Sequence, residues 1–338
     1  MRFRPCLSTS LLAALMSATL AASAAAAALA AARLAQAASS DAPEPMAELV
    51  VEGRHEGPRM WSVRSGAHTL WILGTISPLP KKMVWQPDAV EEVLKQTQEV
   101  VPAWPTYGIG ANPITALRVY IAWRHLQKPP DNLPLRESLP PPLYARVEAL
   151  RERYAPRDTK IEHMRPMLAA RELLLRVFDA VGLAVRNEVQ QEVLSLAARH
   201  GARVHQDKLR IEDPVDVLKD VGATPLAGEV ACLDAVVTLL ETDLANMQAR
   251  ARAWALGDVD ALRQLPHAGD RAACITAVST SERVRKLIAR AQDDWLIAVT
   301  DSLARNRGTL AVQSMDRLLG EHGALATLRA RGYVVEGP

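Results

Sequence analysis

Short apolar runs dominate the chain just after residue 57. Residues 60–64 and 69–73 are two such runs, and a Gly-containing turn at 65–68 separates them, a pattern that predicts a β-hairpin. Pro87 then begins a stretch with apolar residues at helical spacing, which predicts a helix. Residues 99–104 are typical of a third strand. We therefore expect the order strand, strand, helix, strand in this part of the chain.

The middle of the chain has the apolar spacing of helices, interrupted by Pro-rich breaks. The ranges predicted to be helical are 112–126, 138–153, 163–181, 187–200, 213–221, 225–253 and 258–264. Gly201 ends one of these helices, and residues 203–206 then favour a buried strand. A long amphipathic helix is predicted from Ser281 to Arg305.

The last thirty residues return to a mixed pattern. They predict a strand at 309–312, short helical turns at 315–319 and 323–331, and a closing strand at 332–336. Strands at both chain ends therefore enclose the helical middle. This arrangement predicts a helix-rich α/β fold, with a central sheet of N- and C-terminal strands and a large helical middle.

The first residues have the pattern of a secretory signal. Arg2 and Arg4 precede an uncharged, Ala-rich run at 6–32, and no acidic residue occurs before Asp41. Cleavage sites of the small-x-small type end at Ala24 and at Ala37. We prefer Ala37, because a polar, Pro-containing stretch follows it.

This interpretation assigns residues 1–37 to a signal peptide, 38–57 to a flexible N-terminal segment and 58–338 to the folded domain. The alternative is a retained membrane anchor, since the apolar run is long enough to cross a bilayer. With cleavage, we expect a protein of the periplasm or the secreted fraction that has no stable membrane span.

Charge and cysteine content argue against two classes of protein, those that bind nucleic acid and those that hold zinc through cysteines. Without residues 1–37 the chain has 37 basic and 38 acidic residues, and this near-neutral balance argues against binding to nucleic acid. Cys232 and Cys274 remain. In an oxidising compartment such a pair favours a disulfide, and the alternative is two separately buried thiols. One pair of cysteines is not a zinc site, which needs four ligands at short spacings.

Several motifs occur in the order of a known family. They are Leu-Trp-Ile-Leu-Gly-Thr-Ile at 70–76, Arg-Pro at 165–166 before a helix that leads to Gly-Leu at 182–183, the stretch at 189–198, Gly-Ala-Arg-Val at 201–204, Trp-Ala-Leu-Gly-Asp at 254–258, Leu-Leu-Gly-Glu-His-Gly at 318–323 and Leu-Arg-Ala-Arg-Gly-Tyr-Val-Val at 328–335. Together they cover most of the domain at 58–338. The chain resembles the TraB/GumN family of bacterial proteins, which is related to the TIKI metalloproteases.

The resemblance implies an α/β fold with a shallow pocket formed by strands from both chain ends. In the family pattern a His follows Gly-Thr-Ile, a Glu follows the third strand, and a second His precedes the Leu-x-Gly of the tail. Such residues imply a divalent metal used for peptide hydrolysis. Imidazole and carboxylate ligands hold the cation, which lowers the pKa of bound water and so generates hydroxide.

This chain departs from the family pattern at each of those positions. Ser77 replaces the first His, Pro102 the Glu, and Arg317 the second His. Gln206 stands where the family pattern has a further Glu. Ala291-Gln292 lies near the position at which the family usually has an Arg-Asn pair. Proline has no side-chain ligand, and arginine has no lone pair to donate to a metal. The substitutions predict that the metal site is lost and that no metal cofactor is retained.

The residues left at these positions predict a binding pocket instead. Its candidate members are Gly74, Thr75, Ser77, Gln206, Arg317 and Gly320. Arg317 would be the fork that binds an anion or a carboxylate. The alternative is that Arg317 is simply solvated at the surface.

Two other sites are alternatives to this pocket. His205, Asp207, Glu321 and His322 would form a relocated metal site if they converged, whereas an isolated His is usually structural or exposed. Ser77 lacks the Gly-x-Ser-x-Gly context of a hydrolase nucleophile, and before Pro78 it fits a turn.

The leading functional hypothesis is a family member without hydrolytic activity. It would act as a binding or regulatory factor in the cell envelope, for a peptide or an envelope polymer that the sequence does not specify. The alternatives are an active hydrolase that cleaves peptides, with a displaced metal site or without a metal, and a structural envelope protein.

Overall fold

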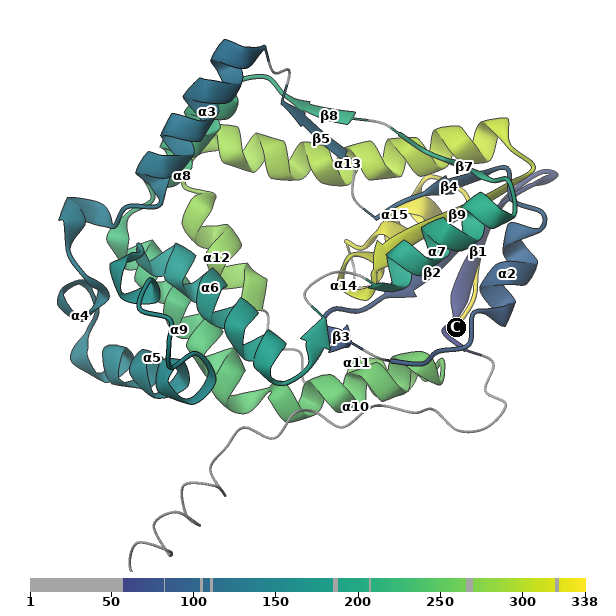
Figure 1. Cartoon of the computed structure of the whole chain (residues 1–338). Helices are drawn as coiled ribbons and strands as arrows, with labels where there is room; N and C mark the ends of the chain where they lie inside the picture. The colour runs from purple at the N-terminus through teal and green to yellow at the C-terminus, as the bar shows by residue number, and fades with distance from the viewer. Residues whose placement is uncertain are drawn as a thin grey trace, which may run out of the picture. The chain divides into compact units, whose positions relative to one another are not determined.

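The computed structural model describes residues 57–81, 83–103, 106–109, 112–184, 188–206, 208–265, 270–319 and 322–338 (Figure 1). The described residues belong to one compact unit. The predicted signal peptide and all of the segment 38–57 except Gly57 lie outside the described residues.

The main sheet is built from both ends of the chain, as the sequence predicts. Its strands are β1 (Met60–Ser65), β2 (His68–Thr75), β4 (Glu99–Val101), β7 (Arg203–Val204), β9 (Gly308–Ser314) and β10 (Val334–Glu336). Their order is β10-β1-β2-β9-β4-β7. β1 pairs antiparallel with β2 and β10, whereas β2, β9, β4 and β7 are parallel to one another.

The centre of the sheet is buried because strands flank it and a long helix packs on it. Leu310, Ala311 and Val312 of β9 are fully buried. The helix α13 (Glu282–Arg305) contacts β2, β4 and β9. Parallel strands covered in this way read as continuous apolar runs, which explains why β9 shows no alternation of polar and apolar residues.

Most of the predicted helices are confirmed. The remaining helices of four residues or more are α2 (Asp88–Leu94), α3 (Pro113–Leu126), α4 (Leu135–Ser138), α5 (Pro141–Tyr154), α6 (Pro166–Ala180), α7 (Glu188–Arg199), α8 (Pro214–Gly222), α9 (Leu226–Thr242), α10 (Leu244–Ala255), α11 (Val259–Gln264), α12 (Asp270–Val278), α14 (Met315–Leu318) and α15 (Ala324–Ala330). Proline occupies the first turn of α3, α5, α6 and α8, where its missing N–H costs no hydrogen bond.

Some boundaries differ from the predictions. The single helix predicted at 225–253 is two helices, α9 and α10, which break at Asp243. The buried Asp243 carboxylate accepts a hydrogen bond from Asn246 Nδ2 at 2.8 Å and lies 3.6 Å from Arg250. No Gly or Pro marks this break, so the apolar spacing does not reveal it.

Two small sheets and the helix α12 were not predicted, and α4 ends where the predicted helix at 138–153 was to begin. β3 (Leu79–Pro80) pairs with β6 (Leu183–Ala184), and β5 (Thr106–Ile109) pairs with β8 (Lys208–Ile211). The prediction of a buried strand at 203–206 was wrong in part, because β7 has two residues and Arg203 is exposed.

The helical middle has its own hydrophobic core, formed largely by α5, α6 and α9. Two kinds of link reinforce it. The disulfide Cys232–Cys274 joins α9 to α12, and the buried Arg165, next to α6, forms an ion pair with the buried Glu229 of α9. Among the described residues no single helix has the length and hydrophobicity of a membrane span, although α8 and α9 pass such a test as a pair bent by 84°.

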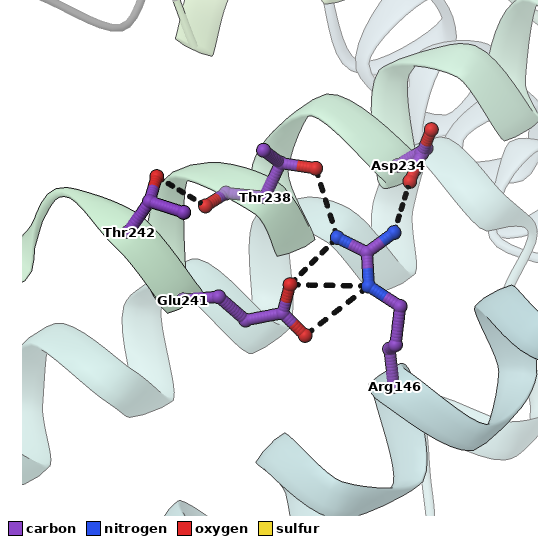
Figure 2. Close-up of polar contacts among 5 residues, drawn as sticks. All are labelled: Arg146, Asp234, Thr238, Glu241 and Thr242. Atoms are coloured by element: carbon purple, nitrogen blue, oxygen red, sulfur yellow. Dashed lines mark hydrogen bonds and ion pairs between the residues drawn. The ribbon is translucent and has the colours of Figure 1, made fainter.

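A surface ion network ties α5 to α9 (Figure 2). Arg146 of α5 lies 2.6 Å from Asp234 and 2.7 Å from Glu241, and it donates to Thr238 Oγ1 at 2.8 Å. The three partners lie on one face of α9 because they are spaced by four and three residues. Because one guanidinium satisfies all three, the network fixes the packing of two helices and is structural.

Candidate functional site

The predicted site residues follow strands that run in the same direction. Because β2, β9, β4 and β7 are parallel, their C-terminal ends lie at one edge of the sheet. Open sheets of this kind usually bind ligands at that edge. Ser77 follows β2, Pro102 follows β4, Gln206 follows β7 and Arg317 follows β9.

Gly74 and Thr75 lie in the packed core. A Cβ on Gly74 would come within 2.3 Å of Met315 Sδ and 2.9 Å of Trp61, so only glycine fits. The Gly74 carbonyl accepts a hydrogen bond from Trp254 Nε1 at 2.7 Å. Thr75 is 1% exposed. These two residues therefore position the site through close packing.

The motif at 254–258 has a structural explanation. Beyond the hydrogen bond from Trp254, Gly257 has a positive φ of 71° and turns the chain after α10. Asp258 then caps α11 by accepting a hydrogen bond from the backbone N–H of Ala261 at 2.9 Å. The motif thus holds β2 and the start of α11 in place.

Ser77 lines an apolar groove of about 530 Å³, which α6, α9 and α12 also form. The apolar walls of this groove include Met167, Leu174, Phe178, Val236 and Ile275, and the disulfide lies against it. The peptide bond between Ser77 and Pro78 is cis. The hydroxyl that replaces the family His therefore faces largely hydrophobic surroundings.

Arg317 lines a different cavity, of about 520 Å³, formed by α13, β9, α14 and α15. Its charged and polar walls include Asp293, Gln313, Asp316, Arg317, His322, Thr327 and Arg331. Trp295 also lines it. That side chain is 3% exposed, and among the described residues its indole Nε1 has no hydrogen-bond partner. A buried indole N–H without a partner is uncommon in folded proteins.

The structure brings together only part of the predicted pocket. Arg317 shares a cavity with His322, whereas Ser77 lines the apolar groove and Gln206 is exposed and lines neither. Gly320 lies outside the described residues, as do Asp207 and Glu321 of the relocated metal site.

A buried carboxylate that the sequence did not single out is Glu99, at the start of β4. Glu99 lies 3.0 Å from His205 Nδ1, and it accepts a hydrogen bond from Asn306 Nδ2 at 2.7 Å. Burial raises the pKa of Glu99, but the hydrogen bonds from His205 and Asn306 outweigh burial and lower the pKa to about 2. Glu99 therefore stays ionised and anchors the last turn of α13 to the sheet.

The residues at the predicted ligand positions do not offer the donors that a divalent metal needs. Ser77 offers a hydroxyl in an apolar groove, Pro102 offers no side-chain donor, and Arg317 is a cation. Among the residues that the structure describes, no group of three or more His, Cys, Asp or Glu is placed to hold a metal ion.

Comparison with known proteins places the chain in a family. No curated protein matches it, and no solved structure does. The family described as TraB/PrgY/gumN matches residues 59–337, which is most of the chain and includes the whole sheet. The chain belongs to the TraB/PrgY/gumN family.

Proposed function

We propose that this protein is an exported binding or regulatory factor of the cell envelope that has lost the metal-dependent hydrolysis implied by its family. The observation that carries the proposal is the residue set Ser77, Pro102, Gln206 and Arg317 at the ligand positions. Export is supported by the charged, apolar and small-residue pattern of residues 1–37.

The cavity beside Arg317 is the proposed ligand site. Arg317 and Arg331 supply two guanidinium groups, and Asp293 and Asp316 supply two carboxylates. A cavity wall that contains both positive and negative side chains suits a ligand with charges of both signs, such as the end of a peptide. It suits a polyanion less well. The unpartnered Nε1 of Trp295 is a further donor for a ligand oxygen.

The loss of metal chemistry is tested by metal content and by the thermal shift on adding Mn²⁺, Co²⁺ or Zn²⁺ to residues 38–338. We expect no bound metal and no shift. The Ser77→His/Arg317→His variant is the comparison, because it restores two imidazoles. Tight metal binding by the natural chain, together with peptide cleavage that a chelator abolishes, would overturn the proposal.

Ligand binding is tested with a peptide library in two forms, with free and with amidated C-termini. We expect binders that need the free carboxylate and that lose about tenfold in affinity in Arg317→Gln, since a charge-assisted hydrogen bond contributes about 1.5–3 kcal/mol. The matched control is Arg329→Gln, an exposed arginine of α15 outside the cavity. Equal loss in both variants would remove Arg317 from the site.

A further inference from the structure

The helix α3 turns its apolar residues toward solvent. Ile114, Leu117 and Ile121 are 71%, 58% and 46% exposed, and their spacing of three and four residues places them on one face. Tyr120 and Trp123 are also exposed and extend this face. A helix that packed its apolar side inward would show the opposite pattern.

The packed side of α3 is the opposite one and is less apolar. The least exposed residues of the helix are Thr115, Val119, Ala122 and Leu126, at helical spacing. The helix contacts α8 extensively, and Figure 1 shows the two helices side by side. The face at Ile114, Leu117, Tyr120, Ile121 and Trp123, here named the α3 face, is therefore left uncovered by the described residues.

Positive charge surrounds the α3 face. Residues 100–130 contain no Asp or Glu, but they contain Arg118, Arg124, His125 and Lys128. A cavity of about 660 Å³ between α3 and α8 is lined by Arg118, His125 and Lys128, together with Lys219 of α8, and by no acidic residue.

Asp131 lies three residues after Lys128, and the acids of α8 that lie closest to Lys219 and to α13 form ion pairs and hydrogen bonds. Asp216 lies 2.9 Å from Lys219 and 3.6 Å from Arg283. Asp220 lies 3.4 Å from Arg283 and accepts a hydrogen bond from Ser281 at 2.8 Å. Because Arg283 and Ser281 belong to the start of α13, the acids of α8 are tied to that helix and do not line the cavity beside α3.

We propose that the α3 face binds the surface of an anionic lipid bilayer. The apolar residues would enter the boundary between headgroups and acyl chains, and the arginines would contact headgroup phosphates. Helices that lie on membranes combine an apolar face with flanking cations, and Trp and Tyr concentrate at the same depth. Each basic residue near such a surface adds to the attraction.

A second copy of the chain fits this face less well. A symmetric contact between two α3 helices would bring the arginines of one copy close to those of the other, and like charges oppose such a contact. A bilayer rich in anionic lipid meets the same residues with opposite charge.

The test is vesicle flotation of residues 38–338, which contain the whole compact unit. Vesicles of phosphatidylcholine alone are compared with vesicles that also contain phosphatidylglycerol. We expect binding to the anionic vesicles, weaker binding at high salt, and little binding to neutral ones. Leu117→Ser/Ile121→Ser should weaken binding about tenfold or more, and Arg118→Gln/Arg124→Gln should abolish the preference for anionic lipid.

Matched controls change exposed residues elsewhere. Ile297→Ser/Val334→Ser removes two apolar side chains that are 50% and 58% exposed, and Arg157→Gln/Arg329→Gln removes two exposed cations. Both controls should bind like the natural chain. All these side chains are solvent-exposed, so melting temperatures should stay the same and a folding defect can be recognised.

Three outcomes overturn the proposal. The first is the absence of binding to anionic vesicles. The second is equal binding by the α3 variants and their controls, as expected if another part of the chain, such as the acidic segment 38–56, covers the α3 face. The third is a dimer in solution that Leu117→Ser/Ile121→Ser converts to a monomer without any change in vesicle binding.

Discussion

The sheet region and the helical region of this protein are stabilised in different ways. In the sheet region, residues 69–75 of β2 pair with residues 308–314 of β9, so the core contains segments from both ends of the chain. In the helical region, neighbouring helices share a separate core that the Cys232–Cys274 disulfide and the Arg165–Glu229 ion pair reinforce.

The two regions also differ in how closely single residues are confined. The sheet confines residues such as Gly74 from all sides, and the motif at 254–258 packs against it. Helices held by links at a few points leave more of their surface unconstrained, and the α3 face is an example. Removing the disulfide or the buried ion pair should therefore destabilise the helical region most. Substitutions that disturb close packing should destabilise the sheet region most.

The largest effect is expected from the buried ion pair. Arg165 Nε lies 3.0 Å from both carboxylate oxygens of Glu229, whose side chain is fully buried. Glu229→Leu leaves a buried cation without its partner and should cost about 3–5 kcal/mol of unfolding free energy in urea titrations.

The double variant Arg165→Met/Glu229→Leu separates pairing from burial. It should recover much of the loss, because two apolar side chains replace two charges. If Glu229→Leu alone lowers the free energy of unfolding by less than about 1 kcal/mol, water or another group satisfies Arg165. That result would contradict the claim that the ion pair stabilises the helical region.

The disulfide should have the next largest effect. It closes a loop across 42 residues, and removing that constraint on the unfolded chain costs about 4 kcal/mol by loop-closure entropy. Cys232→Ala/Cys274→Ala should unfold at lower urea than the oxidised natural chain. Reductant should destabilise the natural chain and leave the variant unchanged.

Two probes show whether the loss is local to the helical region. Trp61, Trp71, Trp85, Trp254 and Trp295 belong to the sheet region, so their fluorescence reports mainly on that core. Circular dichroism at 222 nm reports on all the helices. Separate transitions after reduction would show two stability units, whereas coincident transitions would show that the regions unfold together.

A smaller effect is expected from close packing in the sheet. Gly74→Ala introduces a methyl group 2.3 Å from Met315 Sδ and should cost about 1–3 kcal/mol. The matched control is Gly228→Ala in α9, where the new Cβ lies no closer than 3.5 Å to any neighbour. That change should stabilise the protein by up to about 1 kcal/mol. Equal effects at both positions would contradict the proposed difference between the regions.

Much of the fold was predictable from local patterns. The hairpin follows from two apolar runs around a Gly turn, and Pro at first turns marks several helix starts. The break at Asp243 was not predictable, because no Gly or Pro lies there to mark the end of α9. The pairing of β5 with β8 joins segments far apart in sequence, and no local pattern encodes that contact.

The candidate site was less predictable than the fold. The sequence places Ser77 and Arg317 after strands β2 and β9, which are neighbours in the sheet. It does not show which helices cover each strand end. α6, α9 and α12 form an apolar groove at Ser77, while α13 and α15 form a polar cavity at Arg317. The role of Glu99 was not predictable, because its hydrogen-bond partners His205 and Asn306 are distant in sequence.

The smallest effect is a pH dependence that belongs to the sheet region. The pKa of Glu99 is lowered from 4.5 to about 2, so its contribution to stability is present above pH 4.5 and is lost as the pH falls toward 2. Its neighbour Arg305 is half-exposed, so solvent screens part of the interaction. We expect a loss on the order of 1 kcal/mol across this range.

Urea titrations across that pH range should show a flatter profile for Glu99→Gln, because the amide does not titrate. Glu152→Gln, which changes an exposed carboxylate of α5, is the control and should keep the natural slope. The natural slope in Glu99→Gln would mean that other carboxylates carry the pH dependence. If urea titrations of Glu99→Gln followed by tryptophan fluorescence also show no pH dependence, the effect belongs to the sheet region, because that core contains most of the tryptophans.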